Sequence, residues 1–360
     1  MIKYIGSKRA LLPWIVEIIE KISKLKKANR VVDLFSGSSR VGHALKAKGF
    51  DVVANDINAY AFVLAQTLVE ADAREYTRDR VEKILAELMR VAPVEGWFTK
   101  ANCIDARYFQ PKNGAKIEAI RELIESVYSS DPLLKAILLT SLILAADKVD
   151  STTGIQMAYL KDWAPRAYND LRLEYPPLLP GTGKAFQGDA LDMAGQLEAD
   201  IFYLDPPYNQ HSYLGNYHVW ETLVRWDNPQ TYGVAQKRVD VQERKSPFNS
   251  KREAKEAMRT VLSRINANHV VVSFSNEGFF AAEEIEAMLK DWGYVVRLTR
   301  PHQRYVGARI GIYNPKGEKV GQISHTENRE FLFVATHSQK VCRAFQELSG
   351  PPEVYQSALL

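Results

Sequence analysis

One short motif holds the residue types that activate a weak nitrogen nucleophile. Asp205-Pro-Pro-Tyr208 follows the apolar run 201–204, which places it at the carboxyl end of an expected strand, where ligands bind in parallel α/β sheets. Pro206 and Pro207 have no N–H, so the backbone carbonyls and the Asp205 carboxylate offer only acceptors. Such acceptors bind an exocyclic amine and stabilise the charge that develops on it during attack. Tyr208 can stack on an extruded base, so we predict chemistry at the amine of a nucleobase.

A glycine-bearing turn further upstream has the pattern of a nucleoside site. Asp33-Leu-Phe35-Ser-Gly37 ends an apolar run and precedes a helical pattern. Asp56 lies 19 residues after Gly37, at the end of the next expected strand, where an acidic side chain can accept both hydroxyls of a ribose. The dinucleotide fingerprint has a glycine where this chain has Ser39, because the backbone approaches a pyrophosphate closely there. We therefore favour a nucleoside ligand without phosphates, such as S-adenosylmethionine, over a nicotinamide cofactor.

A parallel sheet is needed to bring these motifs to one edge. Short apolar runs alternate with helical patterns at the start of the chain, which predicts an α/β, Rossmann-like sheet. The expected strands are 30–35, 51–55, 185–186, 200–204, 269–274 and 294–298, followed by a late hairpin from 310–313 that turns at 314–317 and continues to 334.

The sheet pattern is interrupted between residues 72 and 183. Apolar residues recur there at helical spacing, and Asp131-Pro132 begins a helix that runs through Ala146. The pattern predicts a mostly helical insertion. It divides the chain into a first core segment (1–71), the insertion (72–183), a second core segment (184–340) and a C-terminal tail (341–360).

Positive charge is concentrated in three segments. The chain carries +4 overall, whereas residues 1–30, 237–259 and 297–309 together carry +14 and leave −10 on the rest. This asymmetry predicts a face that binds a polyanion such as nucleic acid, with all three segments lining one cleft. The predicted nucleic-acid contacts are Lys237, Arg238, Arg244, Lys245, Lys251, Arg252, Arg300 and Arg304.

Composition excludes several classes of protein. A hydrophobic fraction of 46% and a charged fraction of 25% are those of a globular chain and exclude disorder. The most apolar run, 136–146, is shorter than the ~20 residues that cross a bilayer, and the first residues do not resemble a signal peptide. Cys103 and Cys342 are too few for a disulfide scaffold or a cysteine zinc site, so we expect a cytoplasmic protein. The histidines lack metal-ligand spacing, so we expect no metal.

Taken together, the motifs resemble those of the N6-adenine-specific DNA methyltransferases with a DPPY motif. The segment Lys3-Tyr4-Ile-Gly-Ser-Lys8 resembles the family's N-terminal cofactor segment, whose lysine meets the methionine carboxylate. Asp189, in Gly-Asp-Ala, matches the residue that reads the cofactor adenine. The segments 216–218, 221–222 and 330–333 resemble those that follow the catalytic motif, in family order.

The resemblance implies a Rossmann-like, S-adenosylmethionine-dependent methyltransferase sheet with a helical insertion domain. The enzyme would flip an adenine out of a specific double-stranded DNA sequence and methylate its N6, leaving S-adenosylhomocysteine. The insertion takes the place of a DNA target-recognition domain, and the loop 226–260 would contact DNA as well. By the same resemblance the catalytic residues are Asp205, Pro206, Pro207 and Tyr208, and the cofactor residues are Tyr4, Lys8, Asp33, Phe35, Gly37, Asp56, Asp189 and Asp205.

Several alternatives remain open at this point. N4-cytosine methylation uses an amine with the same chemistry, and Asp205 favours adenine by resemblance alone. An RNA adenine substrate, a nicotinamide-dependent dehydrogenase and a DNA-binding module without activity are further alternatives. The family also suggests a functional pairing with a restriction endonuclease. The DNA sequence that would be recognised is not readable, because base contacts depend on the geometry of a few side chains.

Overall fold

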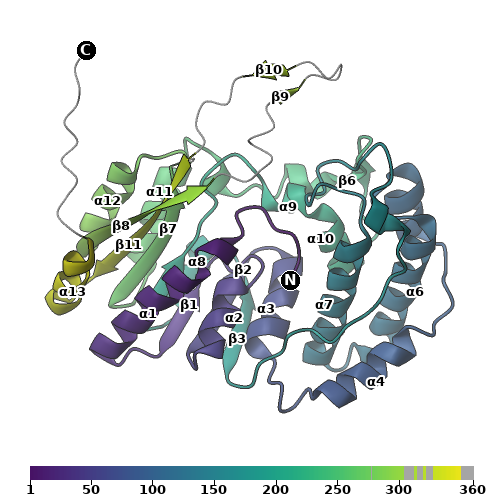
Figure 1. Cartoon of the computed structure of the whole chain (residues 1–360), viewed down its shortest axis with the longest axis horizontal. Coiled ribbons are helices and arrows are strands. Elements are labelled where there is room, and N and C mark those ends of the chain that lie inside the picture. The colour runs from purple at the N-terminus through teal and green to yellow at the C-terminus, as the bar shows by residue number, and fades with distance from the viewer. Residues whose placement is uncertain (277, 304–311, 314–318, 322–326, 350–360) are drawn as a thin grey trace.

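A seven-stranded sheet forms the centre of the molecule and has helices on both faces (Figure 1). The computed structural model describes residues 1–276, 278–303, 312–313, 319–321 and 327–349. The strand order is β3-β2-β1-β4-β7-β11-β8, and the neighbours pair in parallel except that β11 is antiparallel to both β7 and β8. The strands are β1 (Arg30–Asp33), β2 (Asp51–Asp56), β3 (Gly183–Gln187), β4 (Ile201–Leu204), β7 (His269–Ser275), β8 (Tyr294–Gln303) and β11 (Glu327–Thr336). The predicted α/β, Rossmann-like sheet is confirmed.

The central strands are short and apolar because both of their faces are covered by helices. Val31 of β1 points into one core and Val32 into the core on the opposite face. The Val31 face is covered by α1 (Leu12–Lys26), α2 (Arg40–Ala47) and α13 (Gln339–Ser349), and the Val32 face by α8 (Ala190–Gln196), α11 (Ala254–Arg264) and α12 (Ala282–Lys290). The polar residues that follow β1, β2 and β4 therefore meet at the carboxyl edge of the sheet.

A third group of helices packs beyond the β3 side of the sheet (Figure 1). It consists of α3 (Ala59–Ala65), α4 (Arg78–Leu88), α5 (Trp97–Thr99), α6 (Pro111–Tyr128), α7 (Pro132–Val149) and α10 (His218–Arg225), with π-helical turns η2 (Gln66–Glu70) and η3 (Lys100–Asp105). The helices of segment 72–183 share one apolar core with α3 and α10, which flank that segment in sequence. The division into separate domains thus stays a prediction. Within the described residues, no helix is both long and apolar enough to cross a bilayer.

The late hairpin pairs as predicted but does not join the main sheet. β9 (Ile312–Tyr313) and β10 (Lys319–Gly321) pair with each other and form a separate two-stranded sheet. β8 instead pairs directly with β11 along ten residues, and β11 lies between β7 and β8. The predicted turn at 314–317 lies outside the described residues. The local pattern predicted the hairpin but could not show which strands complete the main sheet, because that pairing depends on long-range contacts.

Candidate active site

A cavity opens at the carboxyl edge of the sheet, beside the ends of β1, β2 and β4. It measures about 1040 Å³ including its mouth. All eight residues predicted to bind the cofactor line it: Tyr4, Lys8, Asp33, Phe35, Gly37, Asp56, Asp189 and Asp205. Pro207 of the catalytic motif lines it as well, and Pro206 is buried. Tertiary structure therefore gathers residues that are nearly 200 positions apart in the sequence.

The glycine loop after β1 turns sharply between the sheet and the N-terminal segment. Gly37 has φ +48°, and a Cβ there would lie 2.8 Å from the Tyr4 hydroxyl, so both conformation and space require glycine. Ser39 also has a left-handed backbone, with φ +56°, and its N–H donates to the Ser36 carbonyl at 2.7 Å. Buried Ser39 therefore adopts the left-handed conformation for which other nucleotide-binding loops use glycine.

Asp56 is held at the end of β2 by three hydrogen bonds. Its Oδ2 accepts from the Gly37 N–H at 2.9 Å, and its Oδ1 accepts from the backbone and side-chain nitrogens of Asn58 at 2.9 and 3.0 Å. Burial raises the pKa of Asp56, although these hydrogen bonds oppose the shift. Oδ2 accepts only one of these bonds, so its second lone pair can also accept from a ribose hydroxyl.

Asp205 forms a buried ion pair with Lys8. The Lys8 Nζ lies 3.0 Å from Asp205 Oδ1, and the Lys8 side chain is only 6% exposed. Burial lowers the pKa of Lys8, but Asp205, Tyr208 and Glu330 together raise it more, so the pKa lies above its usual value and the amine stays charged. Burial raises the pKa of Asp205 and Lys8 opposes that shift. The family resemblance assigns Lys8 to the cofactor carboxylate, whereas here it contacts the catalytic aspartate.

Tyr208 lies beside this ion pair. Its ring centroid is 5.4 Å from the Lys8 Nζ and 5.3 Å from the Phe274 ring. Its backbone carbonyl accepts from the Phe279 N–H at 2.8 Å. This hydrogen bond holds the segment after β4 against the segment that follows β7. The ring is thus held near Asp205, as stacking on a base requires.

A stack of tyrosines that was not predicted holds the N-terminal segment across the cavity. The Tyr4 ring is stacked on Tyr217 at 4.8 Å and on Tyr213 at 5.3 Å. The Tyr217 hydroxyl accepts from the Ile5 N–H at 2.6 Å. Tyr213 belongs to α9 (Tyr213–Asn216) and lines the cavity. The available signal was the spacing of Tyr213 and Tyr217, four residues apart after the catalytic motif.

Comparison with known families identifies this arrangement. The model of the "D12 class N6 adenine-specific DNA methyltransferase" family matches residues 4–283, which contain every element of the cavity described above. The chain belongs to this family. The Rossmann-like methyltransferase fold expected from the resemblance is thereby confirmed.

Several curated relatives of this D12-class chain are methylases. It is 30% identical over 325 residues to "Modification methylase StsI" of Streptococcus sanguinis and 31% identical over 308 residues to "Type II methyltransferase M.FokI" of Planomicrobium okeanokoites. These matches cover 86% and 81% of this chain but 49% and 47% of the relatives, so the chain spans about half of their length. "Type II methyltransferase M.NlaIII" of Neisseria lactamica is 26% identical, and the match covers 91% of this chain and 99% of that protein.

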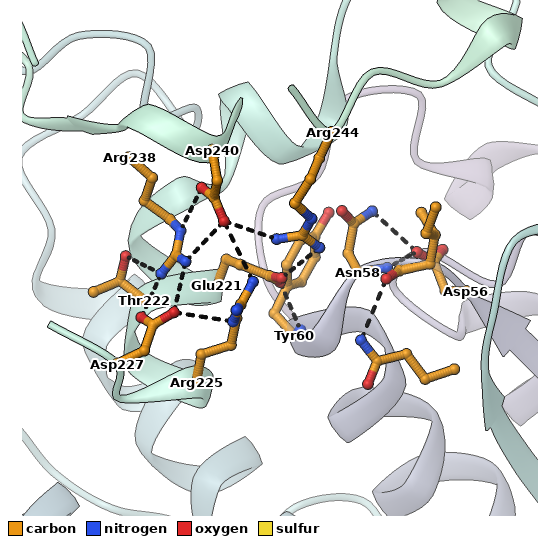
Figure 2. Close-up of polar contacts among 12 residues, drawn as sticks. Asp56, Asn58, Tyr60, Glu221, Thr222, Arg225, Asp227, Arg238, Asp240 and Arg244 are labelled. Atoms are coloured by element: carbon orange, nitrogen blue, oxygen red, sulfur yellow. Dashed lines mark hydrogen bonds and ion pairs between the residues drawn. The ribbon is translucent and has the colours of Figure 1, made fainter. Parts of the chain in front are cut away.

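Two of the arginines predicted to contact DNA in this D12-class chain point into the protein. Arg238 is 2% exposed, and its guanidinium contacts Asp227 at 2.7 Å and Asp240 at 3.0 Å (Figure 2). Its position does not fit a phosphate contact, because both faces of the planar group are enclosed and its donors are paired. Arg244 lines the cavity and donates to Glu221 at 2.9 Å. Sequence reasoning missed Asp227 and Glu221 as partners because both lie outside the basic segment 237–259.

The other predicted DNA contacts are more accessible. Lys245, Lys251 and Arg252 are exposed, and Lys237 is half-buried. Arg300 is 51% exposed, lies 4.7 Å from the Trp14 ring and pairs with Glu17 at 3.6 Å on the α1 side. Arg304 lies outside the described residues. That the accessible cations contact DNA stays a prediction.

The basic segment 1–30 does not line a single cleft with the other two. Lys8 faces the cavity, but Arg30 begins β1 at the opposite edge of the sheet and contacts Asp51, which begins β2. Between them α1 runs from one edge to the other (Figure 1). The prediction of one cleft lined by all three segments is therefore wrong for this segment, because α1 is about 22 Å long and carries Lys21, Lys24 and Lys26 in its last two turns, at the end away from the cavity.

Proposed function

We propose that this chain transfers the methyl group of S-adenosylmethionine to the N6 amine of an adenine that has been flipped out of a specific double-stranded DNA sequence. The observation that carries the proposal is the Asp205–Lys8 ion pair at the wall of a cavity that also holds Asp56 and the glycine loop. A nucleoside site and an acceptor group for an amine thus share one space. Family membership and the methylases among the relatives point to the same reaction.

The residues of the cavity fit a nucleoside with a cationic amino-acid tail. Asp56 would accept from the ribose hydroxyls and Asp189 from the adenine amine, with Phe35 and Gly37 along the ring and sugar. Asp33 Oδ1 is buried and has no hydrogen-bond partner among the described residues, as a site for an ammonium group requires. Burial and the charge of Asp205 raise the pKa of Asp33 to about 8, and a bound cation would lower it. S-adenosylmethionine supplies an electrophilic methyl group when bound there.

Asp205 would prepare the target amine for attack. Its carboxylate and the Pro206 carbonyl accept the two N–H bonds of the amine, which favours a tetrahedral nitrogen and frees its lone pair. The nitrogen forms a bond to the methyl carbon, and the sulfur keeps the electron pair of the bond that breaks. The nitrogen then loses one proton, which Asp205 is placed to accept. Lys8 holds the carboxylate, and Tyr208 stacks on the base.

DNA would approach the mouth of the cavity from the side of the loop 226–260. Lys245, Lys251 and Arg252 are exposed there and can contact phosphates. The helical segment 72–183 would supply contacts that read the sequence. We also propose a cytoplasmic location and a pairing with a restriction endonuclease, since the relatives are named as modification and type II methyltransferases.

Nucleoside analysis of treated DNA tests the proposal. The purified protein is incubated with methyl-labelled S-adenosylmethionine and unmethylated plasmid, and the digested nucleosides are separated by mass spectrometry. We expect N6-methyldeoxyadenosine from the native protein and at least a roughly 100-fold lower yield from D205A, as loss of a transition-state acceptor predicts. N4-methyldeoxycytidine, or label found only in added structured RNA, would replace the proposed substrate. Undiminished methylation by D205A would contradict the mechanism.

A further inference from the structure

A strap of irregular chain, residues 238–250, covers one side of the cavity. Its first residue, Arg238, ends the short strand β6 (Lys237–Arg238), which pairs with β5 (Thr231–Tyr232), and the rest has only two short 3₁₀ turns, η5 (Val239–Gln242) and η6 (Pro247–Asn249). Arg244, Ser246, Phe248 and Asn249 of the strap line the cavity. Phe248 packs edge-to-face on Phe35 with 5.1 Å between ring centroids. Because no α-helix or strand holds the strap after Arg238, its place depends on the side chains that tie it down.

Both ends of the strap are tied to the rest of the protein. At the first end, Arg238 contacts Asp227, which follows α10, and Asp240 within the strap. At the other end, Asn249 Nδ2 donates to the carbonyl of Asn209 at 2.8 Å and to that of His211 at 3.0 Å. The second tie joins the strap to the turn that follows the catalytic motif. The middle of the strap spans the distance between these ties.

The middle is held by one buried carboxylate. Arg244 donates to Glu221 Oε1 at 2.9 Å and lies 3.4 Å from Asp240 (Figure 2). Glu221 is fully buried, and its Oε2 accepts from the Tyr60 N–H at 3.2 Å. Tyr60 lies in the first turn of the helix that follows Asp56 and Asn58, so Glu221 connects the strap to the wall that carries the predicted ribose site.

The positive charge of Arg244 is neutralised by neighbouring acids, so Arg244 does not contribute to a positively charged DNA-binding surface. Three arginines and three acids alternate in this network, and each arginine contacts at least one acid: Arg225, Arg238 and Arg244 with Glu221, Asp227 and Asp240. The next residue, Lys245, is exposed on the outside of the strap. Neighbouring cations therefore face in opposite directions, one into the cavity wall and one outward.

We propose that Arg244 is a positioning residue that, through Glu221, holds the strap over the cavity and thereby sets the affinity for S-adenosylmethionine. The inference rests on the proposed function. Removing the guanidinium leaves Glu221 with the Tyr60 N–H as its remaining hydrogen-bond donor among the described residues, and it frees the middle of the strap around Arg244. The cofactor then loses one wall of its site, whereas Asp205 and Lys8 keep their places. The expected signature is a raised KM for S-adenosylmethionine with little change in kcat.

The test compares R244Q, R244K and E221Q with E243Q, which makes the same charge change as E221Q at an exposed strap position. Direct binding of S-adenosylmethionine is measured by calorimetry, and KM and kcat by label transfer to DNA. We expect Kd and KM to rise roughly tenfold in R244Q, by less in R244K and E221Q, and not at all in E243Q. The double variant E221Q/R244Q should be weakened by less than the product of the single effects, because the two groups act as a pair.

Amide exchange separates positioning from a general loss of stability. In the native protein, S-adenosylmethionine should slow exchange of the strap amides, and this protection should be reduced in R244Q while that of β1 and β4 is kept. If R244Q does not fold, R244K and E221Q carry the same test. A native protein that fails to bind S-adenosylmethionine overturns the proposed function as well. Native binding together with unchanged Kd and strap exchange in all three variants overturns the role of Arg244 alone.

Discussion

The cavity at the sheet edge and the helical layer around α7 are both buried, but they bury opposite kinds of groups. The cavity wall encloses Lys8, Asp33 and Asp56, with Asp205 beside them, and such charges cost free energy to desolvate. The helical layer encloses apolar side chains such as Leu138, which is fully buried in the core that α7 shares with α3 and α6. The cavity holds the groups that carry out the chemistry, whereas the apolar core of the helical layer provides stability that offsets the cost of burying those charged groups. Substitutions in the two regions should therefore separate activity from stability.

The largest effect is expected at Asp205. We predict that D205N lowers turnover by about 10³-fold, which corresponds to ~4 kcal/mol of transition-state stabilisation. The free energy of unfolding should fall by less than about 2 kcal/mol, because the amide has the same shape as the carboxylate and can still present an oxygen to the Lys8 ammonium. Label transfer and urea unfolding measure the two quantities. If D205N lowered the free energy of unfolding by more than it lowered transition-state stabilisation, the two regions would not differ in the way proposed.

The converse is expected at Leu138 in α7. We predict that L138A lowers the free energy of unfolding by about 3 kcal/mol, because it leaves a cavity in a closely packed apolar core. Turnover of the folded protein at low temperature should stay within about twofold of the native value, since Leu138 does not line the cavity. Denaturant unfolding monitored by circular dichroism supplies the first value. Lost turnover in a folded L138A protein would show that the helical layer takes part in the chemistry.

Between the two regions, at the start of α10, the protonation of His218 should make the stability of the protein depend on pH. Burial lowers the pKa of this histidine to about 3, and its Nε2 lies 3.0 Å from the Gln156 carbonyl and 3.1 Å from the Tyr108 hydroxyl. An unfolded histidine titrates near 6.5, so between these values the unfolded chain binds more protons. The contribution of neutral His218 is complete above about pH 6.5 and is lost as the pH falls towards 3. The stability difference between native protein and H218Q should shrink by about 1.4 kcal/mol per pH unit below about 6.5. A difference that is constant with pH would contradict this.

The smallest effect is expected on the exposed side of the DNA-facing loop. We predict that K251Q weakens DNA binding by a few-fold and reduces the slope of log affinity against log salt by about one. Stability should change by less than about 0.5 kcal/mol. K24Q is the matched control, because it removes the same charge from α1 on the other side of the sheet. Equal effects of K251Q and K24Q would mean that DNA binding depends on the net charge of the protein and not on the position of Lys251 in the loop 226–260.

Motifs that adjoin apolar runs could be predicted from the sequence. Asp33, Asp56 and Asp205 lie at or directly after strand ends, so a parallel sheet had to bring them to one edge. Tyr213 could not be assigned in the same way, because its place in the cavity depends on stacking with Tyr4 from a distant segment of the chain. That the β9–β10 hairpin stays apart from the main sheet was missed for a related reason: strand propensity is local, whereas the sheet that a strand joins depends on distant segments.

The family, the α/β sheet and the eight predicted cofactor residues of the cavity could be read from the sequence, because they follow from motifs and from local periodicity. Only the tertiary structure decided what the basic residues face. Arg238 and Arg244 are enclosed by Asp227 and Glu221, which come from outside the basic segment, while Lys245 stays exposed. A count of charge along the chain cannot distinguish these cases, since the direction of a side chain is set by the acids and walls that folding brings beside it.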